Sequence, residues 1–283
     1  MPPILPPLDR IDPAVAWQPW QPSAADPWGR TWAAHLYRRA AFGPSRADLV
    51  EAERLGPDGT LDLLLRGRPG ADDLLPALTD GGRVAAARDE RAAYGDGDQI
   101  RGWWLYCMLQ GGHPLREKMT LFWHNHFATS ITKVQSPVPM FRQNCLLRSH
   151  ALGRFGPLLQ AVSRDGAMLV WLDSNRNVKA HPNENYAREL MELFSLGVGN
   201  YTEKDVREAA RAFTGWHTDG RGFAFDAGSH DDGPKTVLGQ TGAWDGGDVV
   251  RIVLGQPAAA RPTRYWNPWR TPSARAITTS QAW

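Results

Sequence analysis

The chain has 283 residues, of which 42% are hydrophobic and 22% charged, and its formal net charge at pH 7 is +2. A chain of this length and composition can bury the core of a globular protein. The near balance of charge gives no overall attraction to nucleic acid, so we expect no nucleic-acid partner. No apolar stretch approaches the roughly 20 residues of a membrane-spanning helix, so we expect no membrane span.

The N-terminal sequence and the cysteines give expectations about the compartment. MPPILPPLDRIDPAVAWQPW contains neither a basic segment nor an apolar run of the kind found in signal peptides. As written, the chain is therefore expected in the cytoplasm. Cys107 and Cys145 follow no CxxC-type spacing, which favours two free thiols in the core over a disulfide or a zinc site.

Residues 1–30 are rich in proline and predict an extended arm. Apolar residues recur at four-residue steps in GRTWAAHLYRRAAFGPS, which predicts a helix that ends at Gly43 and Pro44. Ser45 with Asp48 three residues later predicts a capping box for the next helix. GTLDLLLRG predicts a third, short helix.

The middle of the chain alternates polar and apolar stretches. Residues 67–98 are rich in Gly, Asp and Arg and predict a solvated connection that contains a short Ala/Arg helix. QIRGWWLYCMLQGG predicts an apolar helix, and Pro114 suits the first turn of the helix after it. A long helical stretch is expected from about residue 139 to residue 170.

Two further helices carry clear end signals. Asn183 is the expected cap of NENYARELMELFSLG, with Gly197 beyond its end. Thr202 and Asp205 form a capping box for a helix that Gly215 ends. A Gly-rich segment near 218–243 then predicts a small β-hairpin or an irregular flap, before a last helix in GGDVVRIVLGQP. The expected fold is mainly α, a single multi-helix domain over residues 31–260.

The stretch LFWHNHFATS contains two histidines near the end of a predicted helix. At 3.6 residues per turn, His126 continues the apolar stripe and His124 lies on nearly the opposite face. A regular helix therefore keeps the two from binding one metal. His126 is either a buried imidazole that bonds near a helix C-terminus, or a ligand or an acid–base group; both remain open.

In NENYARELMELF, the residues Asn185, Glu189 and Glu192 share a face beside the core stripe. Two carboxylates and an amide there could bind a cation through oxygen atoms, or act as general acid and base. Arg188 forms an i,i+4 pair with Glu184 and can also reach Glu192. The alternative is a salt-bridged, solvated helix face.

Two weaker candidates follow. HDDGPK places His230, Asp231 and Asp232 together as loop metal ligands would be, although Asp-Gly turns often produce such strings. RAFTGWH offers Arg211, Thr214, Trp216 and His217 at a helix end, with Arg211 and Trp216 as ligand-binding residues and packing as the alternative for Trp216. No P-loop, GxGxxG, HExxH or GxSxG motif is present, so nucleotide-dependent and serine-hydrolase functions lose support.

The sequence resembles the bacterial family called domain of unknown function 1800, from His35 to about Ala260. The resemblance rests on HLYRRAAFGPS, LREKMTLFWHNHFATS, NENYARELMELFSLGVGNYTEKDVREAARAFTGW and HDDGPKTVLGQTGAWDGGDVVRIVLGQPAAA. The family has no established reaction. Its members often look exported and commonly lie beside genes for sulfatase-like proteins, so the resemblance implies a sulfatase-like protein encoded nearby as a partner.

The family pattern marks a set of positions without giving them chemical roles. These are Trp123, His124, His126, Asn183, Glu184, Asn185, Arg188, Glu189, Glu192, Asp205, Arg211, Thr214, Gly215 and Trp216. The chain departs from the family by lacking an export signal and by ending early. Both departures put localisation and activity in question.

Residues 261–283 differ in composition from the rest of the chain. The segment RPTRYWNPWRTPSARAITTSQAW contains no acidic residue, several prolines and tryptophans, and one residue of the Ile, Leu, Val, Phe and Met group. We expect a non-native tail produced by a frameshift, so that the domain is incomplete at its C-terminal end. The alternative is a disordered arm that binds an anionic partner.

Two functional hypotheses follow. In the first, a pocket lies between the His126 helix and the face of Asn185, Glu189 and Glu192, with Trp123, His124, Arg211 and Trp216 as ligand-binding residues. Hydrolytic or cation-assisted acid–base chemistry on a polar, glycan-like substrate is expected there, with a divalent cation as the cofactor of the cation-assisted form. In the second, the protein is a non-enzymatic module that binds a protein or polysaccharide, and its polar cluster is structural.

Overall fold

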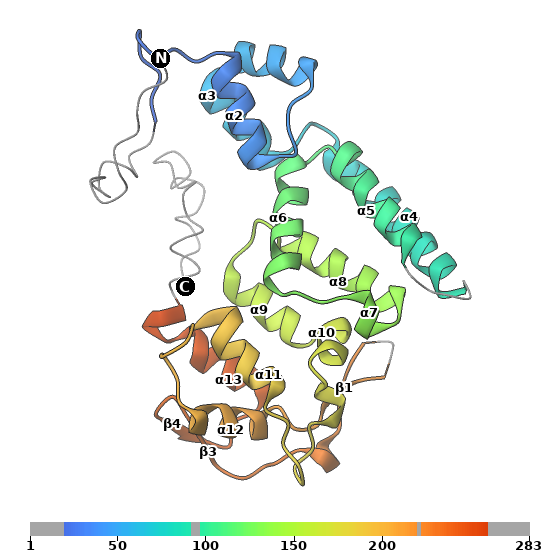
Figure 1. Cartoon of the computed structure of the whole chain (residues 1–283), viewed down its shortest axis with the longest axis vertical. Helices are drawn as coiled ribbons and strands as arrows, with labels where there is room; N and C mark the ends of the chain where they lie inside the picture. The colour runs from blue at the N-terminus through green and yellow to red at the C-terminus, as the bar shows by residue number, and fades with distance from the viewer. Residues whose placement is uncertain (1–19, 92–96, 220–221, 260–283) are drawn as a thin grey trace.

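Helices make up most of the computed structural model, which describes residues 20–91, 97–219 and 222–259 (Figure 1). The mainly α fold is confirmed. Residues 1–19 of the predicted arm and the predicted tail at 261–283 lie outside the described residues. No helix in the described ranges has the length and the apolar run that crossing a bilayer requires.

The N-terminal helices are α2 (Arg30–Ala40) and α3 (Arg46–Arg66). Ser45 and Asp48 form the predicted capping box at the start of α3. The two helices predicted on either side of Gly56 join as α3 with a kink, because Gly56 adopts a φ of 70°. Residues 20–29 do not stand apart as an extended arm. Trp28 donates its indole N–H to Ala52 O at 2.9 Å, which ties this segment to α3.

The prediction of a solvated connection at 67–98 is wrong. Most of this stretch is α4 (Ala71–Arg91), which packs antiparallel to α5 (Asp98–Gln110) as a projecting helical pair (Figure 1). Trp103 donates its indole N–H to Leu78 O at 2.6 Å. A Cβ added at Gly82 would lie 2.5 Å from both Trp103 and Phe141, so the absence of a side chain allows this close approach. Glycine here promotes packing, where composition alone suggested a loop.

Helix α6 (Pro114–His126) begins with Pro114 in its first turn, as predicted. It leads through α7 (Ile131–Val134) to α8 (Pro137–His150), α9 (Phe155–Ser163) and α10 (Gly166–Trp171). The single helical stretch predicted for 139–170 is therefore three helices with turns between them. Asp165 caps α10 by accepting the backbone N–H of Met168.

A short 3₁₀ turn (Ser174–Arg176) and an isolated bridge between Val178 and His181 lead to α11 (Asn185–Glu189). The helix continues as the π-helical segment η3 (Leu190–Ser195), after which Gly197 adopts a φ of 80°. Helix α12 (Glu203–Ala212) has the predicted Thr202–Asp205 capping box.

The Gly-rich segment forms two small antiparallel hairpins. Strand β1 (Trp216–Thr218) pairs with β2 (Phe223–Phe225), and β3 (Lys235–Val237) pairs with β4 (Gln240–Gly242). A 3₁₀ turn at Ala227–Ser229 separates them. Helix α13 (Gly246–Leu254) follows, with a capping box from Asp245, and a 3₁₀ turn at Pro257–Ala259 ends the described chain.

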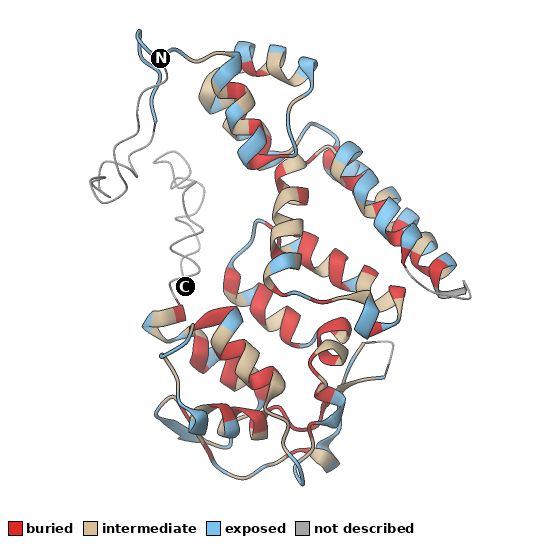
Figure 2. Cartoon of the chain, viewed as in Figure 1, coloured by how far each residue is buried: buried red, intermediate tan, exposed pale blue. Residues whose placement is uncertain are grey.

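Three groups of buried apolar residues hold the described part of the chain together. The main cluster contains residues of α6 and of each helix from α8 through α13, among them Trp123, Phe127 and Leu190. The N-terminal cluster joins α2 and α3 to Leu115. The third cluster joins the projecting pair of α4 and α5 to α8, and we call it the arm cluster. It includes Trp103 and Cys107. Figure 2 shows buried residues concentrated in the body formed by α8 to α13, and exposed residues along the outer faces of α4 and α5.

Candidate functional site

His126 lies among aromatic rings at the end of α6. Its ring lies 4.8 Å from that of Phe127 and 6.2 Å from that of Phe194, centroid to centroid. Its Nε2 donates to Phe194 O at 3.3 Å. Burial lowers the pKa of His126, and the bond to Phe194 opposes that shift only in part. The imidazole is therefore neutral at pH 7 and joins α6 to η3.

His124 faces the other side of α6, as the helical geometry predicts. Its ring meets that of Trp104 edge to face, with 5.1 Å between centroids. Burial lowers its pKa, and it makes no hydrogen bond within the described residues. The two histidines therefore belong to different environments.

Asn185 is engaged in holding the backbone. Its Nδ2 donates to Leu172 O at 3.3 Å, which joins α11 to the end of α10. Asn183 accepts the backbone N–H of Asn185 at 3.0 Å and donates to Asp173 O at 3.2 Å. Asn183 thus accepts the first backbone N–H of α11, although the N-cap residue is Glu184 and not Asn183 as predicted.

Glu189 and Glu192 form a pair of neighbouring carboxyls on α11 and η3. Glu192 accepts a hydrogen bond from Tyr201 Oη at 2.8 Å, and burial together with this carboxylate raises the pKa of Tyr201 to about 12. Glu189 is half-buried and makes no hydrogen bond or ion pair within the described residues. Partial burial and the charge of Glu192 raise the pKa of Glu189, although Arg188 opposes this. Glu189 therefore retains its proton to a higher pH than an exposed glutamate does.

The predicted contact of Arg188 with Glu192 is not made. Arg188 pairs with Glu184 at 2.9 Å, as expected, and makes two hydrogen bonds to Glu203 at 2.7 and 2.8 Å. Glu203 is in the first turn of α12, so the guanidinium joins two helices. Its side chain is 34% exposed and that of Glu203 is 62% exposed. Such exposed pairs contribute at most about 1 kcal/mol.

The π-helical turn explains why the α-helical pattern misplaced this contact. The backbone N–H groups of Leu196 and Gly197 both donate to Met191 O, at 2.9 and 3.0 Å. The wider turn rotates the residues after Leu190 away from the α-helical positions. Glu192 consequently lies near Tyr201 instead of Arg188.

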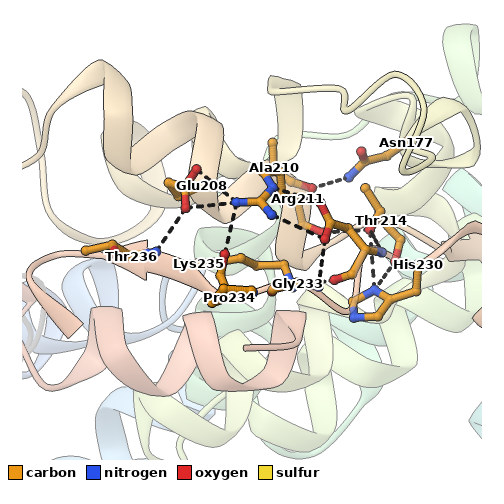
Figure 3. A network of polar contacts seen from close by, with 11 residues as sticks. Asn177, Glu208, Ala210, Arg211, Thr214, His230, Gly233, Pro234, Lys235 and Thr236 are labelled. Carbon is orange, nitrogen blue, oxygen red and sulfur yellow. Dashed lines mark hydrogen bonds and ion pairs between the residues drawn. The ribbon is translucent and has the colours of Figure 1, made fainter. Parts of the chain in front are cut away.

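Arg211 lies in a structural network between α12 and the second hairpin (Figure 3). Its guanidinium bonds Asp231 at 2.8 Å and both oxygens of Glu208 at 3.1 Å. Nδ1 of His230 donates to Thr214 O at 2.8 Å. Asp231 and His230, which resemble loop metal ligands in the sequence, therefore hold their loop against α12 and the residues that follow it.

The two tryptophans predicted to bind ligand are buried in the main cluster. Trp123 is 6% exposed and donates its indole N–H to Ala151 O at 3.0 Å. Trp216 is 3% exposed and lies under the guanidinium of Arg164, 5.1 Å from its ring centre. In this conformation neither ring presents a face on which a ligand can stack.

No group of three or more His, Cys, Asp or Glu side chains in the described ranges is arranged to hold a metal ion. Glu189 and Glu192 supply two carboxylates. A hard cation such as Mg²⁺ often binds through one or two carboxylates with water molecules completing its shell. The pair could bind a cation in this manner.

The structure brings together some of the predicted site residues and separates others. Asn185, Glu189 and Glu192 share α11 and η3, whereas no hydrogen bond joins His126 to any of them within the described residues.

Tyr201 and Glu203 were not predicted from the sequence, because both reach the site from beyond the Gly197 turn. It also missed the buried ion pair of Arg148 with Glu117, whose bonds are 2.7 and 2.9 Å long. Glu117, Thr120 and His124 share one face of α6 at i, i+3 and i+7, and that polar stripe was the available signal.

The model of a family described as "Protein of unknown function (DUF1800)" matches residues 35–262. The chain belongs to this family. No curated protein and no solved structure matches the chain.

Proposed function

We propose that the protein performs acid–base chemistry, hydrolytic or cation-assisted, on a polar, glycan-like substrate at the pair formed by Glu189 and Glu192. The observation that carries this proposal is the state of Glu189. It is a half-buried carboxyl with a raised pKa and no partner within the described residues, beside a carboxylate held by Tyr201. Perturbed and unpaired carboxyls of this kind are characteristic of catalytic acids and bases.

The roles of the two carboxyls follow from their surroundings. Glu189 exchanges a proton with the substrate, because nothing in the described chain competes for its oxygens. Glu192, fixed by Tyr201, stabilises positive charge or holds a divalent cation. In this proposal His126 supports the site indirectly, by anchoring η3 through Phe194 O.

The experiment compares purified wild type with Glu189→Gln on chromogenic aryl glycosides and aryl sulfates, with and without Mg²⁺ or Ca²⁺. We expect one substrate to be turned over and Glu189→Gln to lower the rate by about 10²-fold or more. The melting temperature of the variant should stay unchanged or rise, since functional residues are seldom optimal for stability. Glu184→Gln is the matched control, because Glu184 is the N-cap residue of the same helix but its carboxyl pairs with Arg188.

A second function is favoured by the internal contacts of the polar residues. Asn185, Arg188, Glu192 and Arg211 each bond to a residue of another element. This is the arrangement expected of a non-enzymatic binding protein whose polar cluster only holds helices together. A large fall in the melting temperature of Glu189→Gln, with wild type inactive on every substrate, would establish this second function and remove the first.

A further inference from the structure

A cavity of about 210 Å³ lies where α5 passes the C-terminal end of α6 and the start of α8. The stretch LFWHNHFATS contributes His124, Thr129 and Ser130 to its wall, while α5 contributes Trp103 and Trp104. Figure 1 shows these elements at the junction of the helical pair and the body. The cavity does not include Glu189 or Glu192.

Three buried polar atoms of residues that line this cavity have no hydrogen-bond partner within the described chain. They are Oδ1 and Nδ2 of Asn144, whose residue is 5% exposed, and the indole N–H of Trp104. Native proteins satisfy nearly all their buried polar groups. A buried amide whose oxygen and nitrogen both lack a hydrogen bond is therefore unusual and needs an explanation.

The neighbouring amide shows that the fold can satisfy such a group at this position in the helix. Gln143 accepts the hydroxyl of Thr129 and donates to Asp165 Oδ2 at 2.7 Å. Helix α8 thus presents two buried amides in succession. The Gln143 amide is bonded on both sides by the protein, whereas the Asn144 amide is not bonded within the described residues and belongs to a residue that lines the cavity.

The remaining described wall is mostly apolar, with hydroxyl groups from Ser130 and Thr132. Ile100, Ile131 and Met140 line it, and the His124 ring lies edge to face against Trp104. Burial keeps His124 neutral at pH 7 by lowering its pKa. Arg101, the one charged side chain among the lining residues, pairs with Asp98 at 2.6 Å. Among the described lining residues no group is free to balance a charge, so this wall favours a neutral ligand.

We propose that this cavity binds a small, neutral, planar molecule that presents a hydrogen-bond donor and acceptor side by side, as a nucleobase or a cyclic amide does. The Asn144 amide pairs with that edge in a bidentate manner, and the Trp104 indole donates to a further acceptor. The aromatic wall accommodates the flat ring. Cavities for drug-sized ligands span about 300–1,000 Å³, so this cavity suits a smaller molecule. The proposal is independent of the carboxyl pair, and either can fail without the other.

The test is isothermal titration calorimetry and thermal melting of the full chain with adenine, hypoxanthine, cytosine and uracil. We expect at least one base to bind saturably and to raise the melting temperature. Asn144→Leu should weaken that binding at least tenfold without lowering the stability of the free protein, since it removes two unpartnered atoms. Trp104→Phe keeps a ring but removes the N–H, and it should weaken binding severalfold. Asn125→Leu is the control, because Asn125 is an exposed amide on α6, the helix that borders the cavity through His124.

A measurement on wild type avoids any dependence on variant folding. The indole N–H resonance of Trp104, assigned by its absence in Trp104→Phe, should shift as the base is added. Binding of none of the four bases would overturn the proposal. Equal affinity in Asn144→Leu would also overturn it, and so would a large loss of stability in that variant, which would show that the amide serves the fold.

Discussion

Asp165 is a buried carboxyl at the start of α10, with 6% of its surface exposed. It accepts the backbone N–H of Met168 at 2.9 Å and the Gln143 amide at 2.7 Å. These bonds favour the charged form, but burial outweighs them and raises the pKa of Asp165 to about 6. The native protein therefore binds this proton more tightly than the unfolded chain does.

This difference predicts a pH dependence of stability. The stabilisation from protonating Asp165 is complete below the usual pKa of 3.8 and is lost as the pH rises through about 6. The difference between these two pKa values corresponds to roughly 3 kcal/mol in the free energy of unfolding. Urea unfolding from pH 3.5 to pH 7 should show the wild type losing about this much relative to Asp165→Asn. Parallel curves for the two proteins would mean that the pKa of Asp165 is the same in the native and unfolded states.

At the residue scale, the sequence predicted local roles better than partners. The capping roles of Ser45 and Thr202 depend on residues three positions away, so a short window contains the whole contact. The partners of Glu192 and Arg188 are Tyr201 and Glu203, which a turn at Gly197 brings back to η3. A helical wheel of one segment could not include them.

Helix α4 shows how an element can be hidden by its composition. Gly81 and Gly82 both suggest a loop, yet both lie inside the helix. Gly82 faces Trp103 and Phe141, whereas Gly81 is exposed and its added Cβ would have 3.8 Å to the nearest atom. The sequence lacks a strong apolar stripe here because small residues make the contact. Close packing between backbones leaves little trace in hydrophobic periodicity.

These two glycines provide a matched pair of substitutions. Alanine is about 1 kcal/mol better than glycine in a helix, so Gly81→Ala should stabilise the protein by up to that amount. Gly82→Ala places a methyl group 2.5 Å from two rings and should destabilise it by roughly 1–3 kcal/mol. Chemical denaturation of both variants measures the difference. Stabilisation by both would mean that α4 does not pack against α5 and α8 as described.

At the scale of the whole molecule, the three apolar clusters meet at α6. Leu115 belongs to the N-terminal cluster, Trp123 to the main cluster, and Met119 packs against both. Glu117 reaches Arg148 on α8, whose guanidinium lies 5.0 Å from the Trp103 ring of the arm cluster. Apart from the extent of α4 and the division of residues 139–170 into three helices, the helices of this assembly and their order were predictable from local patterns. The meeting of the clusters was not, because it depends on contacts far apart in the sequence.

Whether the helical pair of α4 and α5 opens separately from the body can be measured at Cys107. This thiol is 1% exposed, and burial raises its pKa to about 11. In a Cys145→Ser background, native Cys107 should react with iodoacetamide on the order of 10³-fold more slowly than in urea, since reaction requires the cluster to open. Rapid alkylation of the native protein would show that α5 separates while the main cluster stays folded.

The position of α6 also determines how much its last turn can change over evolutionary time. Trp123, His126 and Phe127 face the main cluster, and His124 faces the cavity beside Trp104. Asn125 alone is directed to solvent and makes no hydrogen bond within the described residues. Contacts with the main cluster or with the cavity thus limit substitution at four of the five positions from Trp123 to Phe127. Only Asn125 can be replaced without disturbing such a contact. A run of aromatic and imidazole side chains in this segment needs no catalytic role to persist, because the crossing of the helices already limits what can replace them.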